Sequence, residues 1–355
     1  MQPSLFGVAV RDALRGAQNL MPLAGATVER SPVWIVESHP AVQAHWMLDS
    51  ASDGGTWPRR LSSYEETHST SVAARASWVR LCEDLGLQPR FVAAAQLGAM
   101  LAQQQVKLLV LPVCLALSDE EISAVTDYVQ QGGVAVADGM LAFYDDRLRR
   151  RERPGLDAVF GLTPRAVPGL AQLLVHEGQP AAQARLLSGA AACERNIEAA
   201  VAERAAPGLS VQCEHRFGRG TAIYLNLAVC EYASVRLDPK RLNAARDLRR
   251  RVQRVLDTAA VVPPVSVRGK GLPTCLERML LRHKSGRRFL ALRVNAIDSP
   301  SVLQTLSAKA PLTVEVQFAA ATRLRVLGES AWRGPSAHFE LPLDAWRGVF
   351  AELDR

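Results

Sequence analysis

The sequence predicts a parallel α/β domain followed by a small antiparallel β-sandwich. Short apolar runs alternate with helix-like segments over residues 31–139, which is typical of a parallel sheet covered by helices on both faces. One of these helices is well marked, because Ser118 and Glu121 have the spacing of a capping box. After Pro264 the pattern changes to strand-length runs separated by turn residues, without a convincing long helix.

Four strands and three helices are expected in the first half of the chain. The run SPVWIVES at 31–38 is nearly continuous in apolar residues, as is typical of a buried parallel strand. A helix follows, capped by Ser69 or Ser71 and ended by Gly86. Its expected buried stripe is Ala73, Ala76, Val79 and Leu81. The other elements are the strand RFVAA, the helix QLGAMLAQQQ, the strand KLLVLPV, the helix LSDEEISAVTDYVQQGG and the strand VAVADG.

The second half of the chain is less regular at first. Residues 147–206 give no clear succession of elements. The run LSVQCEHRFGRGTAIYLNLAV then predicts two strands joined at Gly218 and Gly220, and a long basic helix is expected over 239–259. The expected domains are an N-terminal helix and linker at 1–30, the α/β domain at 31–262 and the β-sandwich at 263–355.

Composition and motifs favour a cytoplasmic protein without a cofactor. The net charge is +7, but the basic runs lack interleaved aromatic residues, so nucleic acid is not expected as a partner. There is no apolar run of about 18 residues and no signal peptide, so no membrane partner is expected. The six cysteines contain no C-x-x-C pair and are expected to be reduced and buried, with no metal site.

A long polar stretch after the first strand is the main candidate for a binding site. It is expected to be a loop, and it lies at the carboxyl end of a strand, where α/β sheets place their ligands. The side chains expected to contact a sugar or another subunit are Trp46, Asp49, Asp53, Trp57, Arg59, Arg60, Tyr64 and Glu65, with His68 nearby. A subunit contact anchored by aromatic residues is the favoured interpretation, and sugar binding or glycoside hydrolysis by the carboxylates are the alternatives.

Two further positions lie where a nucleophile is often found. Cys114 follows a strand and precedes a helix, a place that can lower the pKa of a thiol. Asp138 follows another strand, at the turn where a nucleophile elbow would hold its reactive residue. No histidine is brought to either position by the sequence, so a buried thiol and an ordinary Asp-Gly turn are the favoured interpretations.

The ordered succession of these segments resembles a known family. The segments AHWMLDS, DGGTWPRRLSSYEETHSTSVAARASWVRLCEDLGLQPRFV, LLVLPVCLALSDEEISAVTDYVQQGGVAVADG and FGRGTAIYLNLAVCEY are similar to the β-galactosidase trimerisation domain of family 42 glycoside hydrolases. TRLRVLGES and HFELPLDAW resemble the small C-terminal β-sandwich of those enzymes. The resemblance covers most of the chain after about Ser31.

This resemblance implies a scaffold without its own catalytic site. The family's trimerisation domain has a flavodoxin-like fold similar to class I glutamine amidotransferases, and the pattern of those enzymes places Ala137 at the nucleophile position. The family's catalytic glutamates lie in a (β/α)₈ barrel, and residues 1–30 resemble only the end of such a barrel. The implied function is oligomerisation, with a trimer as the expected state, or docking on a glycosidase barrel. The alternatives are a stand-alone carbohydrate-binding protein and a glycoside hydrolase that uses the carboxylates of residues 49–65.

Overall fold

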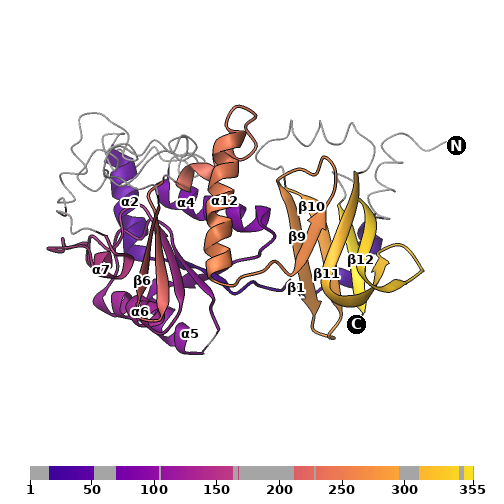
Figure 1. Cartoon of the computed structure of the whole chain (residues 1–355), viewed down its shortest axis with the longest axis horizontal. Coiled ribbons are helices and arrows are strands. Elements are labelled where there is room, and N and C mark those ends of the chain that lie inside the picture. Colours follow the sequence, from indigo (N-terminus) through magenta and orange to yellow (C-terminus); the bar gives the residue numbers. More distant parts are fainter. Residues whose placement is uncertain are drawn as a thin grey trace. The chain divides into compact units, whose positions relative to one another are not determined.

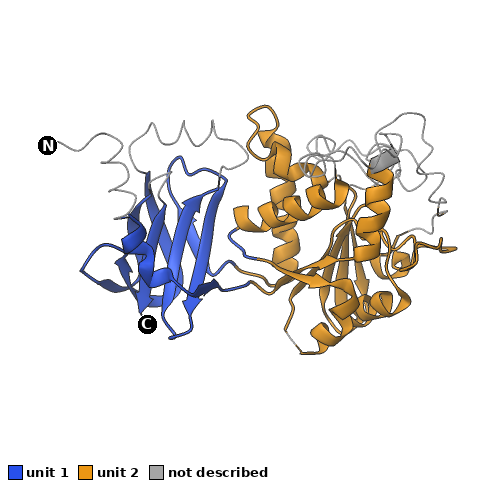
Figure 2. Ribbon diagram, turned by 180° about the vertical axis from the view of Figure 1, so that it is seen from behind, with its two compact units in different colours: residues 1–30, 86–88, 263–355 blue, residues 31–85, 89–262 orange. Residues whose placement is uncertain are grey.

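The computed structural model describes residues 16–51, 69–103, 105–162, 167, 212–227, 229–295, 312–343 and 348–354. The chain divides into two compact units. Unit 1 comprises residues 1–30, 86–88 and 263–355, and unit 2 comprises residues 31–85 and 89–262 (Figure 2). Each unit has its own sheet.

Unit 2 is built on a six-stranded, mostly parallel sheet with the order β3-β2-β4-β5-β7-β6. Its strands are β2 (Val33–Glu37), β3 (Arg90–Ala93), β4 (Leu108–Leu111), β5 (Val134–Asp138), β6 (Gln212–Phe217) and β7 (Gly220–Leu225). All neighbouring pairs are parallel except β6 and β7, which form an antiparallel hairpin at one edge. The predicted parallel sheet and the predicted hairpin are therefore confirmed.

Helices cover both faces of this sheet (Figure 1). Their bounds are α2 (His39–Ala51), α4 (Thr70–Asp84), α5 (Leu97–Gln103), α6 (Asp119–Gln130), α7 (Asp157–Phe160), α11 (Tyr232–Val235) and α12 (Leu242–Thr258), with the 3-10 turns η3 (Ala94–Gln96) and η5 (Val229–Glu231). One face carries Trp34, Leu109 and Ala135, which pack against α5, α6 and α7. The alternate strand residues point to the other face, where α4 packs against η5 and α11, and α11 packs against α12.

The β6–β7 hairpin shows why glycine is required at its turn. A Cβ on Gly220 would lie 2.1 Å from the carbonyl oxygen of Val129 and 2.3 Å from that of Gly133. The hairpin therefore packs directly on the end of α6, and any side chain at this position would push the two apart. The two glycines expected from the sequence therefore form the turn and also allow the hairpin to pack closely against α6.

Helix α4 corrects the predicted buried stripe. Its N-cap is Ser69, whose hydroxyl accepts a hydrogen bond from the Val72 backbone N–H. The residues of α4 that are buried are Thr70, Ser71, Ala74, Ser77, Trp78, Leu81, Cys82 and Asp84. The prediction was right for Leu81 and wrong for Ala73, Ala76 and Val79, because the fully buried Trp78 and its neighbours one turn away define the inner face.

The stretch expected to be a long loop after the first strand begins with a helix. Residues 39–51 form α2, and the Ser38 hydroxyl accepts a hydrogen bond from the Ala41 backbone N–H at its start. Pro40 occupies the second helical position, where its missing N–H costs nothing. The loop interpretation was therefore wrong for this part of the chain.

Unit 1 is an antiparallel β-structure folded around one core. Its strands are β1 (Ala26–Val28), β8 (Val265–Arg268), β9 (Leu276–His283), β10 (Arg288–Val294), β11 (Leu312–Val326), β12 (Arg333–Leu343) and β13 (Val349–Asp354), preceded by the 3-10 turn η1 (Met21–Leu23). The strand order is β1-β9-β10-β13-β11-β12, with β8 paired to β11. The predicted antiparallel arrangement is confirmed.

The long strand β11 pairs with three other strands of unit 1, β8, β12 and β13. Residues 315–318 pair with β8, whereas residues 323–326 pair with β13. Between them the register with β12 shifts, and a Cβ on Gly334 would lie 2.8 Å from the Thr322 carbonyl oxygen. The bend lets Val314, Val316 and Leu324 of one strand share a core with residues of β9, β10 and β13.

The segment expected to be an N-terminal helix and linker also contributes a strand. Residues 26–28 form β1, which pairs antiparallel with β9 as Ala26 with His283 and Val28 with Leu281. The Glu29 carboxylate accepts hydrogen bonds from Arg282 and Arg288 on β9 and β10. The linker interpretation therefore does not hold for these residues, which are part of the sheet of unit 1.

A buried ionic network fastens α4 to α11 and α12. The Arg236 guanidinium donates to Asp84 Oδ1 at 2.7 Å, and the two side chains are 1% and 2% exposed. The Tyr232 hydroxyl donates to the other oxygen of Asp84 and accepts a hydrogen bond from Arg249 at 2.9 Å. These contacts join residues about 150 positions apart in the sequence, so they hold the C-terminal helices of unit 2 in place.

Substitution of one member of this pair should destabilise unit 2 strongly. We expect Arg236→Met to lower the free energy of unfolding by about 3–5 kcal/mol, since it leaves the Asp84 carboxylate buried without its cation. Urea unfolding followed by circular dichroism measures this loss. Arg149→Ala, which removes an ion pair with a 68% exposed arginine, is the control and should cost less than about 1 kcal/mol. Equal losses in both variants would contradict this account of the network.

A second ionic cluster gives unit 1 a pH-dependent stability. Glu352 accepts hydrogen bonds from Arg287 and Arg325, each at 2.6 Å, and Arg325 lies directly opposite it on β11. The hydrogen bond from Arg287 is the main cause that holds the pKa of Glu352 below its ordinary value, and Arg325 adds to it. Because the folded-state pKa is lowered, this stability is present above about pH 4.5 and is lost as the pH falls through the folded-state pKa.

We therefore expect Glu352→Gln to cost about 1 kcal/mol at pH 7 and progressively less as the pH falls below 4.5. Urea unfolding of both proteins at pH 7 and at pH 3.5 measures the difference. Glu329→Gln removes an exposed ion pair with Arg333 and is the matched control, which should cost less. A Glu352→Gln penalty that stays the same at both pH values would refute the assignment.

Candidate functional site

The carboxyl edge of the unit 2 sheet contains the topological switch point. In the sheet, β3 lies beside β2 on one edge and β4 lies beside β2 on the other edge. The chain therefore runs from β2 to β3 and then crosses back past β2 to β4. The connections after β2 and β4 thus leave in opposite directions, and this is where open α/β sheets leave a crevice for ligands. Glu37 is the last residue of β2 and Ser38 follows it, whereas Pro112 and Val113 follow β4.

A small cavity lies at this switch point. Its volume is about 20 Å³, and it is lined by Val36, Glu37, Ser38, Ala41, Val42, Ser71, Arg75, Pro112 and Val113. Such a space holds about one water molecule and is far too small for a sugar. The Ser71 hydroxyl is buried there without a hydrogen-bond partner among the described residues, whereas the Ser38 hydroxyl donates to the Ala116 carbonyl oxygen at 2.6 Å. The crevice is therefore nearly closed.

A wider groove adjoins the cavity on the outer side of α4. It has a volume of about 390 Å³ and is lined by Glu37, Val72, Arg75, Ala76, Val79, Arg80 and Phe91. The Arg75 guanidinium pairs with Glu37, and Arg80 pairs with Glu83 at 2.8 Å. The ring of Phe91, on the edge strand β3, is 45% exposed. The groove therefore has an apolar floor with ion pairs beside it. Its described lining contains one carboxylate, Glu37, and not the two that could act as acid and base.

Asp138 organises the carboxyl edge without being open to solvent. Its Oδ1 accepts the Val113 backbone N–H at 2.8 Å, and its Oδ2 accepts the Trp78 indole N–H at 3.3 Å. The residue is 1% exposed. Val113 has a φ of +42°, a conformation that is costly for a β-branched residue, and its carbonyl oxygen is contacted by His45 Nε2 at 3.0 Å. Asp138 therefore holds a strained turn in place, as expected of a structural carboxylate.

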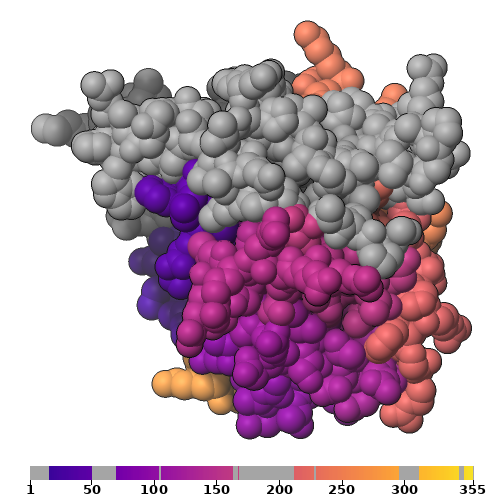
Figure 3. Space-filling model, turned by 90° about the vertical axis from the view of Figure 1, so that its left-hand side faces the viewer, coloured from indigo at the N-terminus to yellow at the C-terminus, as the bar shows by residue number. Residues whose placement is uncertain are grey.

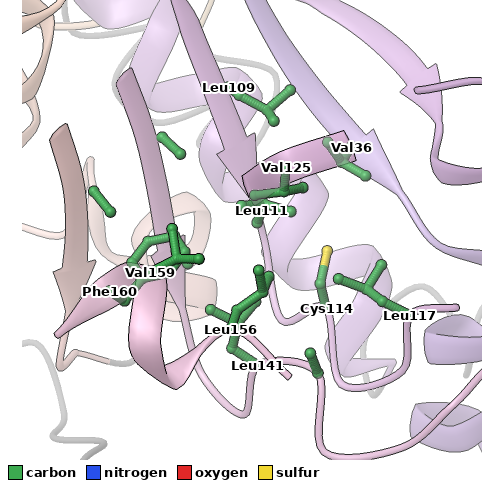
Figure 4. Close-up of a cluster of buried hydrophobic side chains, with 14 of the residues drawn as sticks. Val36, Leu109, Leu111, Cys114, Leu117, Val125, Leu141, Leu156, Val159 and Phe160 are labelled. Carbon is green, nitrogen blue, oxygen red and sulfur yellow. The ribbon is translucent and has the colours of Figure 1, made fainter. Parts of the chain in front are cut away.

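Cys114 is enclosed in the core on the α6 side of the sheet. It is 1% exposed and belongs to the apolar cluster that contains Leu117 and Leu141 (Figure 4). Burial, together with the nearby carboxylates of Asp138 and Glu121, raises the pKa of this thiol well above its ordinary value. The thiol is therefore neutral and shielded, which agrees with the favoured sequence interpretation of a buried, unreactive cysteine.

The structure separates the sequence-predicted contact residues into two groups. Trp46 is half-buried on α2. Asp49, also on α2, is 8% exposed, and its two oxygens accept the backbone N–H and the hydroxyl of Thr70 at 2.7 and 2.8 Å. Asp49 thus joins α2 to the start of α4. The remaining predicted residues, Asp53, Trp57, Arg59, Arg60, Tyr64 and Glu65, and also His68, lie outside the described residues.

Residues that sequence reasoning missed make up much of this edge. His45, Ser71, Arg75 and Trp78 all lie on α2 or α4 and point to the carboxyl ends of β2, β4 or β5. The available signal was Ser38 followed by Pro40, which marks the start of α2. With α2 recognised as a helix, His45 and Asp49 fall four residues apart on one of its faces.

The loop that follows β5 is held by its own aspartate. Asp145 accepts the backbone N–H groups of Arg147 and Arg149 at 2.9 and 2.8 Å, and Leu148 has a φ of +59°. Figure 3 shows the chain around residues 140–160, in magenta, at the surface of unit 2 on this side.

Among the described residues there is no cluster of three His, Cys, Asp or Glu side chains that could hold a metal ion. No helix in the described ranges is both long enough and apolar enough to cross a membrane.

Comparison with known proteins identifies a shared fold. No protein-family model matches the sequence, and no curated protein matches it either. Among solved structures, a catalytic mutant of Gan42B, a GH42 β-galactosidase from G. stearothermophilus, superposes with a TM-score of 0.50 at 11% identity, over 97% of this chain and 42% of that one. The β-galactosidase from Bacillus circulans sp. alkalophilus gives a TM-score of 0.50 at 14% identity, over 96% of this chain and 44% of that one.

These similarities show that the chain shares the fold of a part of GH42 β-galactosidases. The chain spans less than half the length of the enzymes that it matches. At this level of identity the comparison concerns the fold alone.

Chemical labelling tests the role of Asp138. In the native protein we expect iodoacetamide to modify Cys114 only when the fold opens, because the thiol is buried and protonated. Asp138→Ala should increase the rate of Cys114 labelling about tenfold or more, since it frees the Val113 N–H and removes a charge that disfavours the thiolate. Cys275, which is fully buried in unit 1, is the internal control and should keep its rate. Peptide mass spectrometry reads both sites, and an unchanged Cys114 rate would show that Asp138 does not hold the turn.

Proposed function

We propose that this chain is a non-catalytic assembly module of a glycoside hydrolase related to the GH42 β-galactosidases. The observation that carries the proposal is the extent of the fold match, which covers nearly all of this chain and less than half of each enzyme. Those two structures are of β-galactosidases. Because a fold alone does not give a function, the proposal also rests on the site, where the cavity at the carboxyl edge has room for about one water molecule and is too small for a sugar.

The strand order supports a more specific assignment of unit 2. In chain order its parallel strands β2, β3, β4, β5 and β7 are arranged 2-1-3-4-5, which is the doubly wound order of flavodoxin. We assign unit 2 to this flavodoxin-like architecture and, with it, to the trimerisation domain that the sequence resembles. That domain is similar to class I glutamine amidotransferases. The narrow cavity at the carboxyl edge, where the described residues present no activated nucleophile, accords with a scaffold that uses the same framework without the chemistry.

The groove beside α4 is the contact surface that we favour. Its floor consists of Val72, Ala76, Val79 and Phe91, all only partly buried. Apolar residues that line one outer stripe of a helix beside an exposed aromatic ring are typical of protein–protein contacts. The occupant that we propose is a second copy of this chain, with a trimer as the expected assembly, and a glycosidase barrel is the alternative partner.

The hydrolase alternative lacks support from the described residues. Both oxygens of Asp49 are bonded to Thr70, so this carboxylate is not placed to act on a substrate. Asp53 and Glu65 lie outside the described residues. The sugar-binding alternative that rests on Trp46 and Trp57 likewise receives no further observation from the fold.

Light scattering tests the assembly proposal. The molar mass should exceed the 38.6 kDa of one chain and should fall on dilution or after Phe91→Asp, because a buried charge in an apolar contact is costly. Val262→Asp changes another exposed apolar residue, 78% exposed and outside the groove, and should leave the mass unchanged. Aryl galactosides should not be hydrolysed by the chain alone. If the protein is a monomer at all concentrations and also fails to bind a GH42 barrel, the proposal is wrong.

A further inference from the structure

The exposed face of α12 carries a row of arginines that make no ion pair with the part of the chain that the structure describes. Six arginines lie on or at the start of this helix, and three of them have partners. Arg241 pairs with Glu231, Arg251 pairs with Asp247, and Arg249 donates to the Tyr232 hydroxyl. The other three, Arg246, Arg250 and Arg254, are exposed and have no ion pair or side-chain hydrogen bond with the described part of the chain.

These three arginines form a straight line. They are four residues apart, so they lie above one another on the helix surface, about 6 Å from one to the next and over about 12 Å in all. Asn243, also exposed, extends the row at the start of the helix. The opposite face carries Leu248, Val252, Val255 and Leu256, all buried. Packing of that apolar face therefore fixes the direction in which the arginines point, and in Figure 1 α12 lies on the outside of unit 2.

The row is electrostatically unfavourable in the free protein. Like charges four residues apart on a helix repel by roughly 0.2–0.5 kcal/mol per pair, and the row contains two such pairs. A solvated helix face usually alternates acidic and basic residues. Here the acids nearest the row are already committed, Asp247 to Arg251 and Asp257 to Gln253. An anionic ligand with regularly spaced charges would relieve this repulsion.

We propose that the Arg246–Arg250–Arg254 row binds an anionic polysaccharide, in which sulfate or carboxylate groups recur along the chain. Guanidinium groups bind both anions through paired hydrogen bonds, and the amide of Asn243 adds donors and an acceptor for sugar hydroxyls. The exposed residues along the row include no aromatic ring, so the stacking that single-stranded nucleic acid needs is absent from this row. The choice of a carbohydrate as the ligand rests on the proposed link to glycoside hydrolases.

Binding to dextran sulfate, polygalacturonate, neutral dextran and duplex DNA at several salt concentrations tests this inference on the whole chain. We expect the two anionic polysaccharides to bind and neutral dextran not to bind. Changing all three residues of the row, Arg246→Gln, Arg250→Gln and Arg254→Gln, should weaken binding about 30-fold or more and reduce the dependence of log affinity on log salt by about two to three. Glutamine is a good helix former, so this triple variant should unfold at the same or a higher urea concentration.

The matched control removes the same charge elsewhere on unit 2. Arg147→Gln, Arg150→Gln and Arg153→Gln change three exposed arginines of the loop after β5 and should alter the affinity by less than about threefold. Equal weakening by both triple variants, or no binding of either anionic polysaccharide, overturns the inference. Tighter binding to duplex DNA than to dextran sulfate at the same salt also overturns it. Light scattering on the α12 variant separates the two proposals, because loss of polysaccharide binding with an unchanged assembly mass leaves the assembly proposal standing.

Discussion

The carboxylate of Asp138 is the constraint on which the candidate site depends. One of its oxygens binds the backbone of Val113, 25 residues earlier in the chain, and the other binds the indole of Trp78, 60 residues earlier. It thus ties the end of β5 to the turn after β4 and to the middle of α4. A buried carboxylate that accepts two hydrogen bonds is costly to disturb, and this cost is what keeps Val113 in its strained conformation. The same turn leads into Cys114, which is buried, so no thiol is exposed at this strand end.

Helix α4 carries the consequences of this arrangement across unit 2. Its first turn is held by Asp49 of α2, its centre by Asp138, and its last turn by the buried pair of Asp84 with Arg236. With the inner face fixed at three points, the outer stripe of Val72, Ala76 and Val79 is displayed in a defined geometry beside Phe91. The Asp84 network also positions α11 and α12. The orientation of the arginine row on α12 therefore depends on α4, which carries Asp84. The surfaces proposed for assembly and for anion binding thus both lie on helices that buried polar contacts hold in place, and such preorganisation lowers the entropy lost when a partner binds.

Much of the fold was predictable because its signals are local. The capping box of Ser118 and Glu121, the apolar run of β2 and the glycines of the β6–β7 hairpin act over a few residues, and all three were interpreted correctly. The start of α2 was also signalled locally, by Ser38 and Pro40, but its mixture of polar and aromatic residues resembles a loop. The buried stripe of α4 was missed for another reason. Alanine fits either face of a helix, so only the position of Trp78 decides which side turns inward, and that position depends on Asp138.

The sequence by itself determined the kinds of elements, their order, and the change from a parallel α/β domain to an antiparallel β-domain, because hydrophobic periodicity and capping are properties of neighbouring residues. Only the tertiary structure decided which polar residues are structural and which remain available. From the sequence, Asp49, Asp138 and Arg236 would be taken for exposed polar residues. In the structure each is buried and bonded to a partner residue at least 21 positions away in the chain. Arg246, Arg250 and Arg254 look like part of an ordinary basic helix in the sequence, yet they are the arginines of α12 that have no ion pair with any described residue. The physical reason is that the partner of a charge is fixed by strand order and helix packing, which no local pattern specifies.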